Sequence, residues 1–282
     1  MRIPVNITTP ATDAAVPMPS SGRHDVEQLT SAPILTPVQL VSELKLKTVL
    51  AIAAHPDDLD FGAAATLAGL TSAGVNVVYA VLTGGDAGGF DPTQRESMVS
   101  IRQEEQRQAA HQVGVERVEF FDFKDGDVQV THEVMREIVR LMREVRPELV
   151  LTSHPERDWS RLQRSHPDHL ACGEAVVRAS YPAVENPFAY PELVEAGLEA
   201  FKLRWLMLMG GPASRTNVTV DVTGTAQRKI SALNEHASQH PDPTAMRRFV
   251  LKAMEALHPD DGRFGEAFHL VEVNAADTIS GF

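Results

Sequence analysis

From residue 47 onward, short apolar runs alternate with longer amphipathic stretches, and this alternation restricts the possible fold more than any other feature of the sequence. The runs are rich in β-branched and aromatic residues, as buried strands are, and the stretches between them have helical periodicity. Parallel strands need long crossover connections, which such helices supply. The pattern therefore predicts an α/β fold, with a Rossmann-like, mostly parallel sheet and helices on both faces. The predicted strands are residues 48–53, 75–83, 117–123 and 149–152, and the predicted helices are residues 63–72, 94–113, 133–145 and 168–180.

The two ends of the chain differ from this pattern. Residues 1–46 are rich in Pro, Thr, Ser and Ala and show no regular period before residue 38. They are predicted to form a loosely structured N-terminal arm with one short helix, and the functional domain is expected to span residues 47–282. The C-terminal third is less regular. Its candidate strands are residues 205–209, 217–222 and 267–273, and its candidate helices are residues 226–235 and 243–257.

Charge and cysteine content exclude several classes of protein. The chain of 282 residues has 38 acidic and 26 basic side chains, and its net charge of −12 opposes binding to nucleic acid or to an anionic membrane surface. The single cysteine, Cys172, rules out an intrachain disulfide and a multi-thiolate zinc site. We see neither an apolar export signal nor a membrane-spanning stretch, so we expect a cytoplasmic protein. Any metal must be held by imidazole and carboxylate groups.

The tripeptide His-Pro-Asp occurs four times, beginning at His55, His166, His240 and His258, so position has to decide which copies carry chemistry. Ligands of doubly wound sheets bind beyond the carboxyl ends of the strands. The copy at His55 directly follows the first predicted strand and precedes a helix. The copy at His258 follows a helical pattern instead, and we interpret it as a turn.

Two of these copies offer a set of metal ligands. His55, Asp57 and Asp58 place one imidazole and two carboxylates within four residues. Alternatively, the aspartates cap the following helix, which would explain one of them but not the whole set. The segment from His166 to His169 adds two imidazoles, and zinc hydrolases typically use three ligands drawn from His and carboxylate. Here too the alternative is a helix N-cap, with an incidental pair of histidines.

At these segments the chain resembles the LmbE/PIG-L family of zinc-dependent deacetylases, which act on N-acetylglucosamine-type groups. The first family segment, AHPDD followed by an acidic residue and a small-residue helix start, is matched by AHPDDLDFGAAATLA from residue 54. The resemblance extends over residues 48–239. The other matched positions are Arg102, Glu105, residues 113–115, Asp125, Gly126, Lys229, His236, Ser238 and Gln239.

The resemblance implies an activity and a metal. The activity is hydrolysis of the N-acetyl group of a small-molecule amino sugar or amino-sugar conjugate, by metal-activated water with an aspartate as general base. One zinc ion per chain would be held by His55, Asp58 and His169.

The resemblance also implies roles for the remaining polar residues. Asp57 would be the general base, and His166 would stabilise the tetrahedral oxyanion. Asp168 would orient or tune His166; from residue chemistry alone, it could hydrogen-bond the free ring nitrogen of any neighbouring histidine. Arg102 and Asp125 would contact the sugar hydroxyls.

The chain departs from the family pattern at two places. Ala64 and Ala65 replace a Gly-Gly pair at the start of the first helix. Arg164 stands two positions before His166, where the mycothiol deacetylase has a tyrosine. A guanidinium at that position favours a substrate that carries negative charge or many acceptor oxygens, so Arg164 is a predicted substrate-binding residue.

Two other functions remain open. Residues 84–89, GGDAGG, could admit a phosphate in a Rossmann-like nucleotide-binding protein, although the spacing is not GxGxxG and the loop belongs to the second strand–helix connection. A non-catalytic metal-binding module is the second alternative. His154 and Asp158 are interpreted as residues of a surface loop, with the alternative that they reach the mouth of the site. The Pro-rich segment 181–199 is a candidate for covering the substrate or for a contact between subunits of a homo-oligomer.

Overall fold

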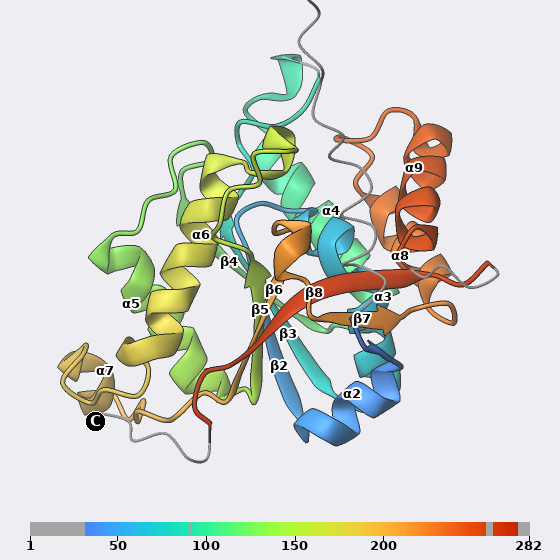
Figure 1. Ribbon diagram of the computed structural model, residues 1–282. Helices are drawn as coiled ribbons and strands as arrows, with labels where there is room; N and C mark the ends of the chain where they lie inside the picture. The colour runs from blue at the N-terminus through green and yellow to red at the C-terminus, as the bar shows by residue number, and fades with distance from the viewer. Residues whose placement is uncertain (1–31, 91, 258–261, 276–282) are drawn as a thin grey trace, which may run out of the picture.

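The structure is a computed structural model that describes residues 32–90, 92–257 and 262–275. An eight-stranded sheet with the order β1-β7-β8-β6-β5-β2-β3-β4 forms its centre (Figure 1). The strands are β1 (Ile34–Leu35), β2 (Thr48–Ala53), β3 (Asn76–Thr83), β4 (Arg117–Phe123), β5 (Leu149–Ser153), β6 (Trp205–Met209), β7 (Val218–Asp221) and β8 (Gly265–Glu272).

The sheet is mostly parallel, as the alternation of strands and helices predicts. The central strands from β6 to β4 all pair in parallel, and β1 pairs in parallel with β7. Strand β8 alone runs against its neighbours, β6 and β7. Strands β2 and β4 have the predicted bounds, and β6 also matches its predicted range. The predicted fold class is confirmed.

Helices cover both faces of the sheet, and an apolar core lies on each face (Figure 1). Residues of the helices packed on one face form a core with Tyr79 of β3, whereas the core on the other face includes Ile52 of β2. On the first face lie α2 (Pro37–Leu44), α3 (Asp58–Ser72), α4 (Met98–Gln112), α8 (Ala226–Glu235) and α9 (Pro243–Glu255). On the second face lie α5 (His132–Val145), α6 (Pro167–Arg178) and α7 (Pro191–Glu195).

The topology brings two distant segments together at the carboxyl edge of the sheet. His55 follows the end of β2 and precedes α3, and His169 lies in the first turn of α6, after β5. Because β2 and β5 are neighbours, these two connections end side by side. Helix α6 also packs tightly on β5, since a Cβ at Gly173 would collide with the carbonyl oxygen of Ser153.

Of the predicted N-terminal arm, residues 1–31 lie outside the described residues. The predicted short helix corresponds to α2, where Leu40 and Leu44 are buried in the core. Strand β1 adds an edge to the sheet. The division of the chain at residue 46 stays a prediction, and the predicted turn at His258 falls outside the described residues. None of the described helices is both long and apolar enough to cross a membrane.

Candidate active site

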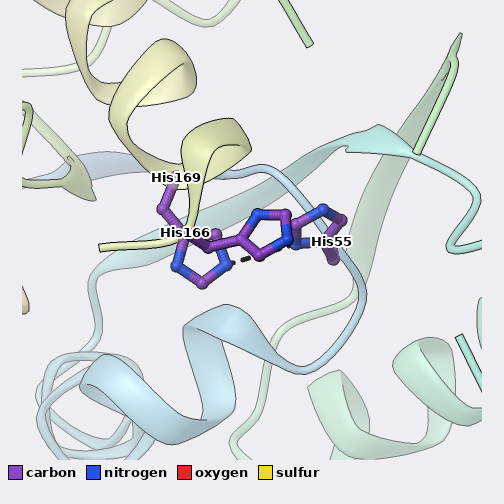
Figure 2. A group of neighbouring side chains, drawn as sticks. All are labelled: His55, His166 and His169. Atoms are coloured by element: carbon purple, nitrogen blue, oxygen red, sulfur yellow. Dashed lines mark hydrogen bonds between the residues drawn. The ribbon is translucent and has the colours of Figure 1, made fainter. Parts of the chain in front are cut away.

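Three histidines from two connections converge at the carboxyl edge of the sheet (Figure 2). The Nδ1 atom of His55 lies 3.2 Å from Nε2 of His169. The ring centroid of His166 is 5.0 Å from that of His55 and 5.2 Å from that of His169. Figure 2 shows the three imidazoles turned toward one another between the loop after β2 and the start of α6. The structure thus brings together the histidines of the two predicted segments.

Asp58 completes a triangle of ligand atoms with two of these histidines. Its Oδ1 lies 2.9 Å from Nε2 of His169, and its other oxygen, Oδ2, lies 3.4 Å from Nδ1 of His55. Zinc ligands in tetrahedral sites stand roughly 2.0–2.2 Å from the metal, which puts neighbouring ligand atoms about 3.3 Å apart. The spacing and the two-nitrogen, one-carboxylate donor set therefore fit a zinc ion.

The second ring nitrogen of His55 faces two further carboxylates. Nε2 of His55 lies 3.1 Å from Asp168 and 3.2 Å from Asp125. The Asp168 carboxylate is buried and accepts hydrogen bonds from the backbone N–H groups of Gly126, at 2.8 Å, and Val128, at 3.3 Å. Such backing by a carboxylate fixes the ring orientation and tautomer of a metal-binding histidine.

Asp168, which the resemblance expects to orient or tune His166, contacts both His55 and His166. The described contacts of its carboxylate include His55 but not His166. Only its backbone N–H reaches His166, donating a hydrogen bond of 3.2 Å to Nδ1. His166 is the N-cap residue of α6, so the start of the helix holds its ring in place.

The carboxylates around the imidazoles favour positive charge at the site. Burial opposes the charged form of His55, but Asp125 and Asp58 raise its pKa to about 11. Burial likewise opposes ionisation of Asp58, but His169 and His55 hold its pKa below the usual range. The pKa of His169 is raised, since Asp58 outweighs burial. By contrast, burial and the neighbouring imidazoles of His55 and His169 lower the pKa of His166.

Asp57 stands beside the ligand triangle in an unusual backbone conformation. Its φ of 93° is in the left-handed region, and although it occupies the N-cap position of α3 its side chain makes no capping hydrogen bond. Capping therefore does not explain this aspartate. Burial and the neighbouring Asp58 raise its pKa to about 7. Its carboxylate lies 3.6 Å from Arg102 and 3.8 Å from Nε2 of His240.

Arg102 is buried, and its guanidinium packs against the glycine-rich loop formed by residues 84–89. Its guanidinium donates to the carbonyl oxygens of Pro56, at 2.6 Å, and Gly85, at 3.2 Å. A Cβ at Gly85 or Gly88 would collide with this guanidinium, which explains the glycines without a phosphate. Asp125 closes the loop by accepting a hydrogen bond of 3.1 Å from the backbone N–H of Ala87. The structure therefore places both predicted sugar-binding residues next to the candidate metal site.

Sequence reasoning named His236 through the resemblance but missed the buried polar network that Gln106 and Asp60 form with it behind Asp57. The side-chain oxygen of Gln106 accepts a hydrogen bond of 2.8 Å from the backbone N–H of Asp57. Its amide nitrogen donates to Asp60 at 2.8 Å, and Asp60 also lies 2.9 Å from Nε2 of His236. Gln106, Asp60 and His236 are fully buried. One available signal was the position of Gln106, which lies one helical turn after Arg102 and so faces the same way.

Arg164 lies apart from the histidine cluster. It lines a neighbouring cavity of about 390 Å³, together with His154 and Asp158. His154 and Asp158 are buried there, so their interpretation as surface-loop residues is wrong.

The described fold and site define a class: an α/β protein with a candidate metal centre of His and Asp at the carboxyl edge of a mostly parallel sheet. Residues 50–180 match the family model described as PIG-L, GlcNAc-PI de-N-acetylase. A diacetylchitobiose deacetylase of Thermococcus kodakarensis is 33% identical over 199 residues, which are 70% of this chain and 72% of that protein. A probable N-acetyl-alpha-D-glucosaminyl L-malate deacetylase 2 of Bacillus cereus is 31% identical, over 68% of this chain and 83% of that protein.

The fold is also shared with a solved structure. The N,N'-diacetylchitobiose deacetylase of Pyrococcus horikoshii superposes with a TM-score of 0.75 at 23% identity, covering 92% of this chain and 95% of that one. The chain belongs to the PIG-L family of de-N-acetylases. It is accordingly an enzyme, a hydrolase that acts on N-acetyl amide bonds.

Proposed function

We propose that the protein is a zinc-dependent hydrolase that removes the N-acetyl group from a small amino sugar or amino-sugar conjugate. The observation that carries the proposal is the triangle formed by His55, Asp58 and His169. Nδ1 of His55 and Nε2 of His169 are 3.2 Å apart, and the two oxygens of the Asp58 carboxylate lie 2.9 Å from the His169 nitrogen and 3.4 Å from the His55 nitrogen, close to the spacing of ligand atoms in a tetrahedral zinc site.

In this proposal, His55, Asp58 and His169 hold one zinc ion, and Asp168 orients His55 from behind. Bound zinc supplies a Lewis acid that polarises the acetyl carbonyl and makes water more acidic. Asp125 also faces Nε2 of His55, at 3.2 Å, and its carboxylate adds to the negative charge around the proposed metal.

Asp57 and His166 are the proposed catalytic groups. The Asp57 carboxylate takes the proton of the attacking water and returns it to the departing amine, a general acid–base role worth roughly 10²–10⁴-fold. His166 accepts the Asp168 backbone N–H at Nδ1, so its neutral ring carries the proton on Nε2. That N–H donates to the oxygen of the tetrahedral intermediate, where one well-placed donor is worth about 3 kcal/mol. The products are acetate and a free amine.

The substrate class follows from the relatives, whose names specify diacetylchitobiose, N-acetylglucosaminyl malate and an inositol-linked 2-acetamido sugar. All of these compounds contain an acetylated amino sugar. Arg102 and Asp125, next to Asp57 and His55, are the proposed contacts to the sugar hydroxyls.

An acetate-release screen tests the proposal. The purified chain is assayed against N-acetylglucosamine, diacetylchitobiose and N-acetylglucosaminides, after loading with zinc and after treatment with a chelator. We expect stoichiometric acetate and amine from at least one substrate, abolished by the chelator and restored by zinc. Equal rates in the zinc-loaded and chelated samples would contradict the metal dependence.

A further inference from the structure

The third copy of the His-Pro-Asp tripeptide, residues 240–242, has no part in the proposed mechanism, yet its histidine lies beside the proposed general base. Nε2 of His240 is 3.8 Å from Oδ2 of Asp57, and both side chains are mostly buried. This copy lies in the connection between α8 and α9 rather than after a strand (Figure 1). The position rule that selects His55 therefore gives no reason to expect a role for His240.

The aspartate of this copy has a structural role that the histidine does not share. Asp242 is the N-cap residue of α9, and its side chain accepts a hydrogen bond of 2.9 Å from the backbone N–H of Ala245. The His240 ring instead packs edge-on against Phe61 of α3, with the ring centroids 4.9 Å apart. Helix capping thus explains Asp242 but leaves the position of His240 unexplained.

The connection that carries His240 is fixed to the helix and the loop around the proposed general base. The backbone N–H and the hydroxyl of Ser238 donate to the Glu105 carboxylate on α4, at 2.8 and 2.7 Å. The side chain of Gln239 lies on the glycine-rich loop, where a Cβ at Gly88 would come within 2.8 Å of its Oε1 atom. These contacts hold the backbone that leads into His240.

The His240 ring is neutral and faces a carboxylate. Burial and the charges of His236 and Arg102 lower its pKa from the usual value, although Glu105 opposes them. A neutral imidazole has one N–H donor and one acceptor nitrogen. Nε2 of His240 is buried without a hydrogen-bond partner among the described residues, and it faces Oδ2 of Asp57. The tautomer with its proton on Nε2 is therefore favoured, because only that tautomer presents a donor to the carboxylate.

His240 and Arg102 face the same oxygen of the Asp57 carboxylate. Oδ2 lies 3.6 Å from the Arg102 guanidinium and 3.8 Å from Nε2 of His240. The other oxygen, Oδ1, is thus left to take the proton of the attacking water. Contacts between catalytic groups are often long before substrate binds, and they tighten to hydrogen-bond length in the complex.

We propose that His240 is a positioning residue for the general base: its Nε2–H holds Oδ2 of Asp57, so that Oδ1 stays directed to the reacting water. The inference rests on the proposed deacetylase function. Gln106 accepts the backbone N–H of Asp57 and fixes the main chain, whereas His240 fixes the carboxylate.

Two substitutions at His240 test the role of the donor. His240→Leu keeps an apolar contact for Phe61 but has no N–H, whereas His240→Gln places an amide N–H at a similar distance from the backbone. We expect His240→Leu to lose roughly 10- to 100-fold in kcat, because a hydrogen bond to a charged group is lost. Its KM and zinc content should stay nearly unchanged, and His240→Gln should retain most of the kcat. Acetate release measures both kinetic parameters.

His111→Leu is the matched control, since it also removes an imidazole. His111 is exposed on α4, and this variant should have the kcat of the unmodified chain. An unchanged kcat in His240→Leu would overturn the inference while leaving the deacetylase function intact. Equal losses in His240→Leu and His240→Gln would do the same, because they would assign a packing role to the ring. So would a higher KM at constant kcat, which would make His240 a substrate contact.

Nuclear magnetic resonance separates failure of the inference from failure of the proposed function. The ring signals of His240 in the isotope-labelled, zinc-loaded chain are assigned by their absence in His240→Gln. We expect a neutral ring with its proton on Nε2, and signals that shift in Asp57→Asn but not in the exposed control Asp127→Asn. A proton on Nδ1, or signals that do not respond to Asp57→Asn, would refute the contact whether or not any compound is hydrolysed. Absence of acetate release from the unmodified chain would contradict the proposed function.

Discussion

The backbone N–H of Asp57 donates a hydrogen bond of 2.8 Å to the side-chain oxygen of Gln106, on the neighbouring helix α4. Asp57 has a φ of 93°, a conformation that costs a non-glycine residue of order 1–3 kcal/mol and needs support from its surroundings. Gln106 provides that support and is itself held by Asp60. The proposed general base is thereby fixed by a residue that touches neither metal nor substrate.

Replacement of this positioning residue should affect turnover more than binding. Gln106→Leu keeps the volume of the side chain but leaves the Asp57 N–H without an acceptor, at a cost of about 1–3 kcal/mol. We expect kcat to fall roughly 10- to 100-fold, with KM and zinc content nearly unchanged. Gln108→Leu, on the exposed face of the same helix, is the control and should leave kcat unchanged. A proportional loss of zinc and of kcat in Gln106→Leu would indicate a structural defect instead.

Removal of metal should destabilise the folded chain. A ligand that binds only the folded state stabilises it by about 2.7 kcal/mol at a concentration of 100 times its Kd. We expect a chelator to lower the thermal midpoint and zinc to restore it. In His169→Ala, which lacks one ligand, the midpoint should respond little to either treatment.

Asp168 should control metal affinity through His55. Asp168→Asn removes the charge that faces Nε2 of His55 at 3.1 Å, and it weakens the acceptor of the Gly126 and Val128 N–H groups. Loss of such a partner typically reduces metal affinity by roughly 10- to 100-fold. Competition with a chromogenic chelator measures this affinity. Asp127→Asn is the control. Asp127 lies exposed between Gly126 and Val128, and this variant should bind zinc with the affinity of the unmodified chain.

The pair of His154 and His269 should make the fold sensitive to acid. Burial lowers the pKa of His154 from 6.5 to about 4, and burial also lowers the pKa of His269. Between these pH values the unfolded chain binds protons that the folded chain does not, so stability rises with pH through this window. The stability gained by keeping these histidines neutral in the folded chain is fully present above pH 6.5 and is lost progressively as the pH falls toward 4.

Urea unfolding at pH 6.5 and pH 4.5 measures this effect. We expect His154→Asn to lose less stability between the two pH values than the unmodified chain does. His111→Asn, at an exposed position of α4, should lose as much as the unmodified chain. An equal loss in all three proteins would assign the acid sensitivity to other groups.

Much of the fold could be predicted because its signals are local. The apolar run at residues 48–53 coincides with β2, since buried parallel strands consist of continuous apolar residues. The predicted strand at residues 117–123 coincides with β4, a half-buried strand at the edge of the sheet whose charged residues are interspersed with aromatic ones. Strand β1 contains two residues, too few for a period, and α7 contains five. The predicted helix 94–113 begins too early, because Gln94 ends a short 3-10 helix and a turn separates it from Met98, where α4 begins.

The position rule could predict site residues only where they follow strands, and Arg102, on α4, was predicted through the resemblance alone. His55 and His169 lie at the carboxyl edge, so the rule for doubly wound sheets brought them together, and the family resemblance supplied their roles. Gln106 is 49 residues from Asp57 in the sequence, and the contact exists only once α4 packs beside α3. The burial of His154 likewise depends on β8, since His269 lies on that distant strand.

Zinc content and turnover, measured together in two single variants, test the central claim most directly. Asp57→Ala and His169→Ala are purified under identical conditions, analysed for zinc by mass spectrometry and assayed for acetate release. We predict that Asp57→Ala retains one zinc per chain and loses roughly 10²–10⁴-fold in kcat, whereas His169→Ala loses both metal and activity. Near-normal hydrolysis by Asp57→Ala, or full zinc content in His169→Ala, would contradict the account.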